Sequence, residues 1–273
     1  MDTVVAALIM GVVQGLTEFL PVSSSAHSTL VPFLLNIRDP FINSFSFSVI
    51  LNLGTLAALL IYFVRDWTRL LVAFVAAVRE RSLASDPDRR LAVLIAVATI
   101  PALVIGYLLR SLEDTLHAQV GLIATLLVVG AAILWLAERS GSRTKVALDL
   151  SARSALAIGF AQSLALVPGI SRSGISISAG LFLGLRRDEA ARFSFLMAIP
   201  IVTAASAFEV FQVVRGTGPA MPLGPTVVGV LASFVCGVAA IAVLLRFLRT
   251  RSTDVFVAYR VLLAAVVLVV WLG

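Results

Sequence analysis

The chain has 273 residues, of which 60% are hydrophobic and only 13% are charged, and its mean hydropathy is +1.04. Soluble domains carry about 25% charged residues, so this composition excludes an ordinary soluble domain. It predicts one all-α polytopic membrane domain over residues 1–273. The net charge of +6 does not indicate a nucleic-acid partner, because the basic residues lie between apolar segments rather than along one soluble face.

The first apolar region is broken. It runs from Thr3 to Leu20, is interrupted by Pro21-Val22-Ser23-Ser24-Ser25, and resumes from Ala26 to Leu35. The second piece is about ten residues, or ~15 Å of helix, which is too short to cross a bilayer. Non-helical backbone is tolerated at membrane depth only inside protein or beside a wet cavity. The pattern therefore predicts a re-entrant helical hairpin.

Six stretches are long and apolar enough to form transmembrane helices of about 20 residues. They are 42–64, 91–109, 119–137, 193–214, 225–245 and 255–272. A second broken region lies between the third stretch and the fourth. It runs from Ser154 to Val167 and from Ile175 to Leu185, around Pro168-Gly169-Ile170-Ser171-Arg172-Ser173-Gly174. We expect a second re-entrant hairpin there.

An internal repeat relates the two hairpins. Pro21 with its serines recurs at Pro168, an offset of 147, and Phe45-Ser46-Phe47 recurs as Phe193-Ser194-Phe195, an offset of 148. Each half, residues 1–140 and 150–273, is then one hairpin followed by three spans. An odd number of spans inserts the second half upside down, which predicts an inverted-topology repeat with polar sites near the midplane between the halves.

The basic residues predict the orientation. Of the 21 Lys and Arg residues, sixteen fall in one set of connections, three fall in the other set, and two lie inside apolar segments. Cytoplasmic loops carry the excess of Lys and Arg. We therefore expect both termini and the first hairpin on the outer side, and the second hairpin entering from the cytoplasm. The three residues on the outer side are Arg38, Arg110 and Arg215.

Gln14 and Glu18 are the polar residues of the first helix, and their spacing of four places them on one helix face. A carboxylate and an amide oxygen together suit a divalent cation, which prefers oxygen ligands. A protonated glutamic acid hydrogen-bonded inside the helix bundle is the structural alternative. Carboxylates inside membranes are costly and usually functional, so we expect Glu18 to belong to the site.

The serines after Pro21 are candidates for an anion site. Ser23, Ser24 and Ser25 can cap the next helix, whose free N–H groups and positive dipole end would then point inward. His27 lies in the first turn of that helix. A lone histidine is usually structural, but beside these serines and Glu18 we expect it to act as a base or as a nucleophile.

The second hairpin also has serines at a helix start, and it adds the positive charge of Arg172. Arg172 stands at a helix start between Ser171 and Ser173, and its planar guanidinium matches phosphate oxygens. An unpaired arginine at membrane depth costs at least ~2.5 kcal/mol, so Arg172 needs an anionic partner. That partner is either Glu18, as a structural ion pair, or a bound ligand.

These residues carry a family resemblance. Gln14-x-x-x-Glu18, Pro21-Val22-Ser23-Ser24-Ser25-Ala26-His27 and Pro168-Gly169-Ile170-Ser171-Arg172-Ser173-Gly174 closely resemble the undecaprenyl-diphosphatase (bacitracin-resistance) family of bacteria. Shorter similar stretches are Leu53-Gly54-Thr55-Leu56, Ile100-Pro101-Ala102, Phe193-Ser194-Phe195-Leu196, Ile199-Pro200 and Ala258-Tyr259-Arg260, so the similarity covers essentially the whole chain. Two positions differ from what is often found in the family. Ser176 stands where Thr is common, and Asn52 replaces a Gln or His.

The resemblance implies an inner-membrane enzyme that removes the terminal phosphate of undecaprenyl diphosphate and recycles the lipid carrier for cell-wall synthesis. It also implies a divalent cation, Mg²⁺ or Ca²⁺, and a site open to the outer side. The implied catalytic residues are Glu18, Ser24, His27 and Arg172, with Glu18 and Gln14 on the metal. The expected substrate-binding residues are Ser23, Ser25, Ser171, Ser173, Gly174 and Ser176.

A transporter or flippase of a polyprenyl phosphate lipid is the rival interpretation. Inverted repeats with broken helices are a common transporter plan, and an anion site at helix N-termini would serve translocation equally well. The acid, the histidine and the arginine together favour chemistry, because binding alone does not need a general base. The sequence does not decide the oligomeric state and leaves a homodimer open.

Overall fold

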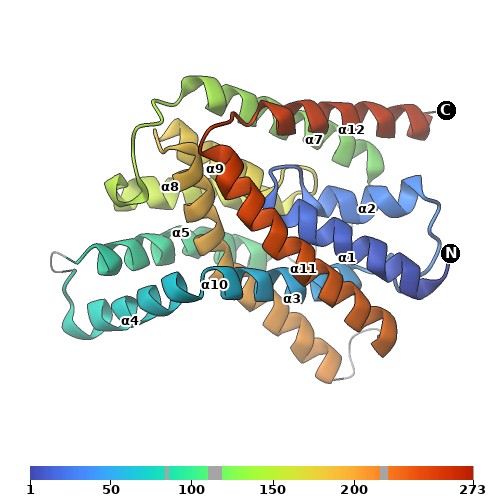
Figure 1. Ribbon diagram of the computed structural model, residues 1–273, viewed down its shortest axis with the longest axis horizontal. Coiled ribbons are helices and arrows are strands. Elements are labelled where there is room, and N and C mark those ends of the chain that lie inside the picture. Colours follow the sequence, from blue (N-terminus) through green and yellow to red (C-terminus); the bar gives the residue numbers. More distant parts are fainter. Residues whose placement is uncertain (84–85, 110–118, 216–220, 273) are drawn as a thin grey trace.

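The computed structural model describes residues 1–83, 86–109, 119–215 and 221–272, which are almost entirely helical (Figure 1). Arg110, one of the three basic residues expected on the outer side, lies outside these ranges. The first part of the chain forms α1 (Thr3–Phe19), α2 (Ser24–Leu34), α3 (Phe45–Tyr62), α4 (Val64–Glu80), α5 (Pro87–Leu109) and α7 (Val120–Ser140). The rest forms η2 (Ala147–Asp149), α8 (Ala152–Ser163), η3 (Leu164–Leu166), α9 (Arg172–Phe182), α10 (Arg187–Val214), α11 (Leu223–Leu248) and α12 (Asp254–Leu272).

The described part of the chain confirms an all-α protein with several apolar helices of membrane-spanning length. Five helices meet this description: α5, α7, α11, α12 and residues 187–208 of α10. They match five of the six predicted stretches. The remaining stretch forms α3, which is separated from α4 only by Phe63 and meets it at an angle of 82°. The two helices together form either a broken span or a re-entrant element by length and composition.

Helix α4 was not predicted, because residues 65–90 were interpreted as a charged connection. Its apolar residues follow the helical period instead of forming a continuous run. Leu70, Ala73 and Ala77 are buried, and α4 packs against α5. Exposed valines, including Val72 and Val75, lie on its outer side. A search for continuous hydrophobic stretches overlooks such a helix, because arginines and acids occupy the intervening positions.

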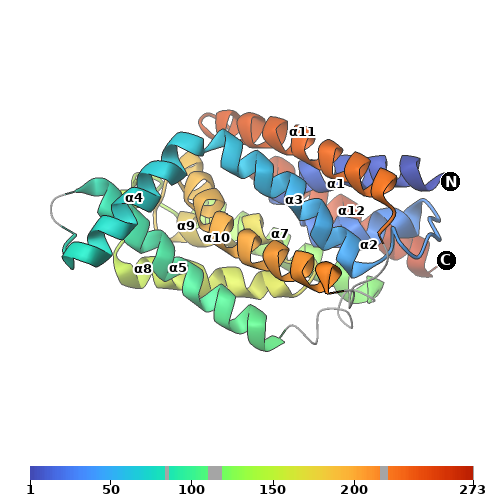
Figure 2. The same cartoon turned by 90° about the horizontal axis from the view of Figure 1, so that it is seen from below.

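The two predicted chain breaks are confirmed, and both lie inside the bundle. Helices α1 and α2 form one hairpin, and α8 with η3 and α9 forms the other. Pro21 and Val22 in the first turn are buried, as are Pro168 and Gly169 in the second. Figure 1 shows α1 and α2 in the half of the molecule that carries both termini, and α8 in the opposite half. Figure 2 shows the same separation after a quarter turn.

The first helix of each hairpin packs closely on a long helix from the other part of the chain. Helix α1 lies against α11, and α8 lies against α5. A Cβ atom added at Gly11 would come 2.2 Å from the carbonyl oxygen of Gly229, and one at Gly159 would come 2.2 Å from that of Ala98. Small residues permit this approach, which is how helices associate in membranes.

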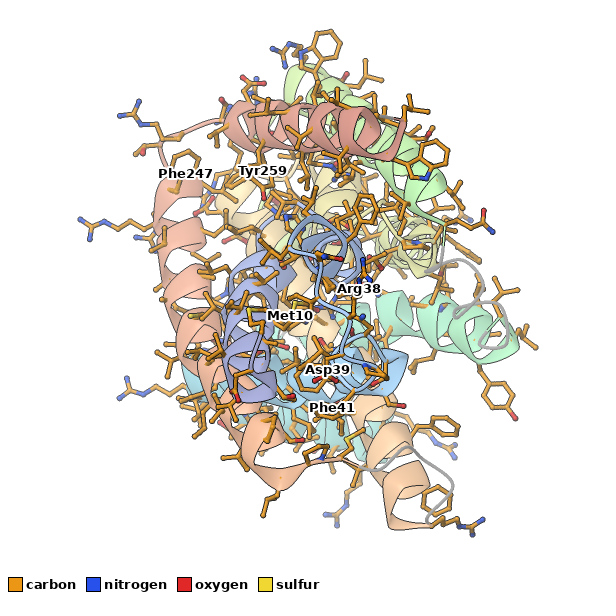
Figure 3. The ribbon with its side chains drawn as sticks, turned by 90° about the vertical axis from the view of Figure 1, so that its right-hand side faces the viewer. Met10, Arg38, Asp39, Phe41, Phe247 and Tyr259 are labelled. Atoms are coloured by element: carbon orange, nitrogen blue, oxygen red, sulfur yellow. The ribbon has the colours of Figure 1, made fainter. Side chains whose placement is uncertain are left out.

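Asp39 attaches the loop between α2 and α3 to the start of α1, at the end of the molecule seen in Figure 3. Its carboxylate accepts hydrogen bonds from Thr3 Oγ1 at 2.6 Å and from the backbone N–H of Phe41 at 2.9 Å. The Thr3 hydroxyl, helped by the backbone donors, lowers the pKa of Asp39 below its usual value. This stabilisation is therefore present at neutral pH and is lost as the pH falls through that lowered pKa.

Glu138 joins several helix ends at the opposite end of the bundle. It is 3% exposed at the end of α7 and pairs with Arg187 at the start of α10 and with Arg143 at 2.7 Å. It also accepts the backbone N–H of Thr253, just before α12, at 3.1 Å. A buried carboxylate is stable only with such partners, so this cluster fixes where α7, α10 and α12 meet.

The packing of α1 on α11 predicts a difference between two Gly→Ala variants. Gly11→Ala should lower the stability by about 1–3 kcal/mol, because the added methyl meets a helix backbone that cannot move aside. Gly224→Ala is the matched control, since a Cβ there has no neighbour within 4 Å. The measurement is the midpoint of thermal unfolding in detergent. Equal midpoints for the two variants would contradict the close contact.

Candidate active site

Glu18 lies where the two hairpins meet, at the end of α1. Its Oε1 accepts a hydrogen bond from Arg172 Nη2 at 2.6 Å, and its Oε2 accepts one from Ser24 Oγ at 2.5 Å. Ser24 is the first residue of α2, and Arg172 is the first residue of α9. The carboxylate, which is 9% exposed, therefore receives one donor from the start of each hairpin's second helix.

The two helix starts have the same local geometry. Ser23 caps α2 and Ser171 caps α9, each with a φ of 76°, a left-handed conformation that is uncommon for serine. Each cap hydroxyl accepts a backbone N–H three residues ahead, at 3.3 Å for Ser23 and 3.1 Å for Ser171. Such strained caps persist only where their surroundings enforce them, and they are common at ligand sites. Two positive helix ends thus point toward one region.

Arg172 is only half satisfied. Its Nη2 is paired with Glu18, but its Nη1 is buried and has no hydrogen-bond partner among the described residues. A buried guanidinium nitrogen without an acceptor is costly. An anionic oxygen beside Nη1 would remove this cost, and the planar group could then hold two oxygens at once. Arg172 is therefore arranged to bind an anion in addition to its ion pair.

Gln14 extends the cluster to α3. Its Nε2 lies 2.8 Å from Glu18 Oε2 and 2.7 Å from Asn52 Oδ1, so two oxygen atoms converge on one point. Amide nitrogen and oxygen are assigned from the hydrogen-bond network, and turning the Gln14 amide would bring a third oxygen to the same place. A set of hard oxygen donors is what Mg²⁺ and Ca²⁺ prefer. The donor chemistry therefore fits a divalent cation at Gln14, Glu18 and Asn52.

His27 lies beside this cluster but is not hydrogen-bonded to it. It is 4% exposed, and its Nδ1 lies 2.7 Å from the backbone oxygen of Ser23. Its Nε2 lies 2.7 Å from the hydroxyl of Tyr259, and the two rings are nearly parallel with centroids 5.7 Å apart. Both ring nitrogens are thus occupied without Glu18, Ser24 or Arg172.

The remaining predicted site residues mostly hold the hairpins in place. Ser25 Oγ lies 3.2 Å from Ser23 Oγ, and the N–H of Gly174 caps onto Ser171. The other two donate to backbone carbonyls: Ser173 to that of Leu20 at 2.9 Å, and Ser176 to that of Arg172 at 2.7 Å. A substrate-binding role for these residues stays a prediction.

Arg260 fastens both hairpin turns to α7 and α12. It is 0% exposed. Its guanidinium donates to the carbonyl oxygens of Pro21 at 3.3 Å, of Gly169 at 2.7 Å, of Ile170 at 3.0 Å and of Leu127 at 3.1 Å. The carbonyls of Pro21, Gly169 and Ile170 belong to the two non-helical turns, whereas that of Leu127 lies inside α7. Arg260 thereby compensates for two breaks in the backbone at once.

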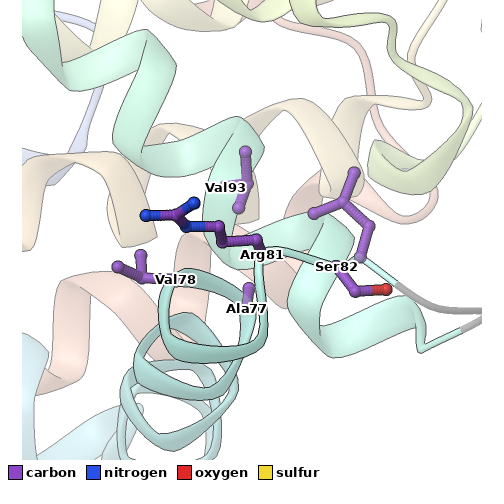
Figure 4. Close-up of a pocket in the computed structure, with 6 residues that line it drawn as sticks. Ala77, Val78, Arg81, Ser82 and Val93 are labelled. Carbon is purple, nitrogen blue, oxygen red and sulfur yellow. The ribbon is translucent and has the colours of Figure 1, made fainter.

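A separate hollow lies between α4 and α5 near their connection, away from the hairpin turns (Figure 4). Its lining residues are Ala77, Val78, Arg81, Ser82, Leu83 and Val93. None of them is a predicted site residue or a partner of Glu18. We therefore place the candidate active site at the Glu18 cluster, where the polar groups converge.

Comparison with known proteins identifies the family of this chain. Residues 7–266 match the family described as bacitracin resistance protein BacA. The chain belongs to this family. It is 44% identical to an undecaprenyl-diphosphatase of Micrococcus luteus over 97% of this chain and 95% of that protein. Proteins of the same name from Myxococcus xanthus (43% identity, 96% and 87% coverage) and Gemmatimonas aurantiaca (44% identity, 97% of each chain) are similarly related.

Three contacts of this BacA-family chain were not predicted from the sequence. Asn52 was considered doubtful because it departs from the usual family residue, yet it contacts Gln14. Arg260 was noticed as a charge inside an apolar span, but its carbonyl acceptors were not foreseen. Tyr259 was quoted only as part of a stretch similar to the family, and nothing in the sequence connected it with His27, which lies 232 residues away.

Proposed function

We propose that this chain hydrolyses undecaprenyl diphosphate to undecaprenyl phosphate and inorganic phosphate, and that the Glu18–Arg172 cluster is its active site. The observation that carries this assignment is the buried Nη1 of Arg172, which has no described partner beside two convergent helix starts. A diphosphate brings several negative charges and many acceptor oxygens. Fixed donors aimed at those oxygens are the main means of catalysing phosphoryl transfer.

Each residue of the Glu18–Arg172 cluster and its surroundings has a separate role in the proposed reaction. Arg172 binds the terminal phosphoryl group through Nη1, and the N–H groups at the two helix starts donate to its oxygens. His27 accepts the proton of the attacking water. Ser24 is the alternative nucleophile, because its hydroxyl already donates to a carboxylate. The other predicted serines and Gly174 keep both helix starts aimed at the same phosphate.

Glu18, Gln14 and Asn52 would hold the divalent cation. This proposal is supported by the two oxygens that converge on the Gln14 amide and by the purely oxygen-based donor set. A cation there supplies charge neutralisation for the diphosphate when it is bound. The protein's own part is to orient the carboxylate, which Arg172 and Ser24 do from either side.

Removal of the cation should abolish activity. Purified protein treated with a chelator should stop releasing phosphate from a polyprenyl diphosphate, and added Mg²⁺ or Ca²⁺ should restore the release. Asn52→Leu should raise the metal concentration needed for half-maximal activity by about 10- to 100-fold. Full activity in excess chelator would contradict the metal site, and an unchanged metal requirement in Asn52→Leu would remove Asn52 from it.

A second experiment distinguishes a bidentate phosphate clamp from a simple positive charge. Arg172→Lys keeps the charge but not the planar fork. Turnover should fall by about a hundred- to a thousandfold, with a much smaller change in KM, because the contact is strongest in the transition state. Arg153→Lys, at an exposed position in the same hairpin, is the control.

The outcomes for Arg172 are separable by steady-state kinetics and thermal unfolding in detergent. Normal turnover with a raised KM in Arg172→Lys would mean that the charge merely attracts substrate. If Arg172→Lys fails to fold while Glu18→Gln is stable and active, Arg172 is a structural partner only, and the site assignment is wrong.

The two halves, 1–140 and 150–273, form an inverted-topology repeat in this proposal. The support is reciprocal: α1 packs on α11 as α8 packs on α5, and the caps Ser23 and Ser171 are 148 residues apart with equal φ. Gly11 and Gly159, at the two close helix contacts, have the same offset. The hairpins then enter the bacterial inner membrane from opposite sides, as re-entrant elements among six spans.

The orientation proposed from the basic residues places both termini and the opening of the site on the outer side. Single cysteines in a Cys236→Ser background test it. A cysteine at Pro40, in the loop after α2, should react with a membrane-impermeant thiol reagent in intact cells. One at Ser142, after α7, should react only once the membrane is opened. Both positions are exposed. The reverse pattern would overturn the orientation.

A further inference from the structure

The hydrogen bonds of His27 determine which of its nitrogens can accept a proton. Nδ1 lies 2.7 Å from the carbonyl oxygen of Ser23. A carbonyl only accepts hydrogen bonds, so Nδ1 must carry a hydrogen whether the ring is neutral or charged. The basic lone pair of neutral His27 is therefore on Nε2.

That lone pair is directed at Tyr259. The Tyr259 hydroxyl lies 2.7 Å from Nε2, and the parallel stacking of the rings holds the two groups together. No other hydrogen bond to Nε2 occurs within the described ranges. While the ring keeps this position, a proton can reach His27 only by way of the Tyr259 oxygen. The tyrosine also lies nearer the surface: Tyr259 is 43% exposed, whereas His27 is 4% exposed.

We propose that Tyr259 is the relay through which His27 receives a proton during phosphate release. This inference rests on the proposed function. The attacking water gives a proton to the Tyr259 oxygen as its own oxygen bonds to the terminal phosphorus, and the hydroxyl hydrogen of Tyr259 moves to His27 Nε2. The bond between that phosphorus and the bridging oxygen breaks, and undecaprenyl phosphate leaves with the bridging oxygen. Tyr259 is neutral before and after the transfer, and His27 becomes an imidazolium. Its new Nε2–H then donates to the same oxygen, since a phenol can both donate and accept.

The arrangement also explains why α12 carries Tyr259 and Arg260 next to each other. Arg260 fixes both hairpin turns through their carbonyls, and Tyr259 reaches His27 from the same turn of the helix. The hydroxyl is thus anchored to the backbone that positions Ser24 and Arg172. A relay needs this precision, because proton transfer requires the groups to be within hydrogen-bonding distance.

Tyr259→Phe tests the relay, because it keeps the stacked ring and removes only the hydroxyl. The turnover rate should fall by about a hundredfold or more, while KM changes little. Tyr62→Phe, on the exposed end of α3, is the matched control and should leave kinetics unchanged. If the hydroxyl only shields His27 from water, Tyr259→Phe should keep or raise the turnover rate, and the relay is then wrong.

A double variant separates a relay from two independent effects. Groups that act as a unit are strongly non-additive. His27→Gln combined with Tyr259→Phe should therefore be about as slow as His27→Gln alone. Additive losses would overturn the relay even if each single variant is impaired.

A spectroscopic measurement tests the hydrogen bond independently of activity. The chain has two histidines, so His117→Gln leaves His27 as the only one. With ¹⁵N-labelled histidine, Tyr259→Phe should shift the Nε2 resonance of His27 and leave Nδ1 almost unchanged. Identical spectra would overturn the contact itself. Wild-type protein that releases no phosphate would instead overturn the proposed function, whatever the spectrum shows.

Discussion

The buried guanidinium of Arg260 is the interaction on which the site geometry depends. A bare arginine at membrane depth costs at least ~2.5 kcal/mol, and within the described residues Arg260 has no acidic partner. Its acceptors are carbonyl oxygens of both hairpin turns and of α7. The carbonyl oxygens of Pro21 and Gly169, in the broken backbone, require hydrogen-bond donors, and the Arg260 guanidinium has only donors and requires acceptors. The two groups therefore compensate for each other's burial. One side chain on the last helix thus brings two distant turns together and places both helix starts on Glu18.

The cluster around Glu18 is satisfied without ligand except at one atom. Arg172 pairs with the carboxylate, and Ser24 and Gln14 donate hydrogen bonds to it, so that its burial is compensated. The exception is Arg172 Nη1, which has no acceptor in the described structure. An incoming phosphate oxygen therefore gains an unused donor before it has to compete with Glu18. Because donors at both helix starts lie near Nη1, the site should bind an anion with several oxygens, such as a phosphate, more tightly than a carboxylate.

Much of this architecture could be predicted from the sequence because it has local causes. Clusters of proline, glycine and serine favour breaks in apolar helices, so both breaks and the residues around them were found. The amphipathic helix α4 was missed, since its apolar residues are spaced by charges such as Asp66 and Arg69. The His27–Tyr259 contact could not be predicted, because it depends on how α12 packs on α2 and leaves no local pattern. The pairing of Ser24 and Arg172 on one carboxylate likewise requires the tertiary structure.

At an offset of 148 residues, the residues of the candidate site have different counterparts in the second part of the chain. Gln14 corresponds to Gln162, Ser24 to Arg172 and His27 to Ile175. The two residues that contact Gln14 have apolar counterparts: Glu18 corresponds to Leu166, and Asn52 corresponds to Pro200. Gln162 is 3% exposed, and neither its Oε1 nor its Nε2 has a described partner. Gln162 therefore occupies the position equivalent to Gln14, but the equivalents of Glu18 and Asn52 cannot pair with its amide. Glu18 and His27 lie on one hairpin and Arg172 on the other, so the candidate site forms only where the hairpins meet. A chain that lost either hairpin would retain charged groups without their counterparts, which a membrane interior does not tolerate.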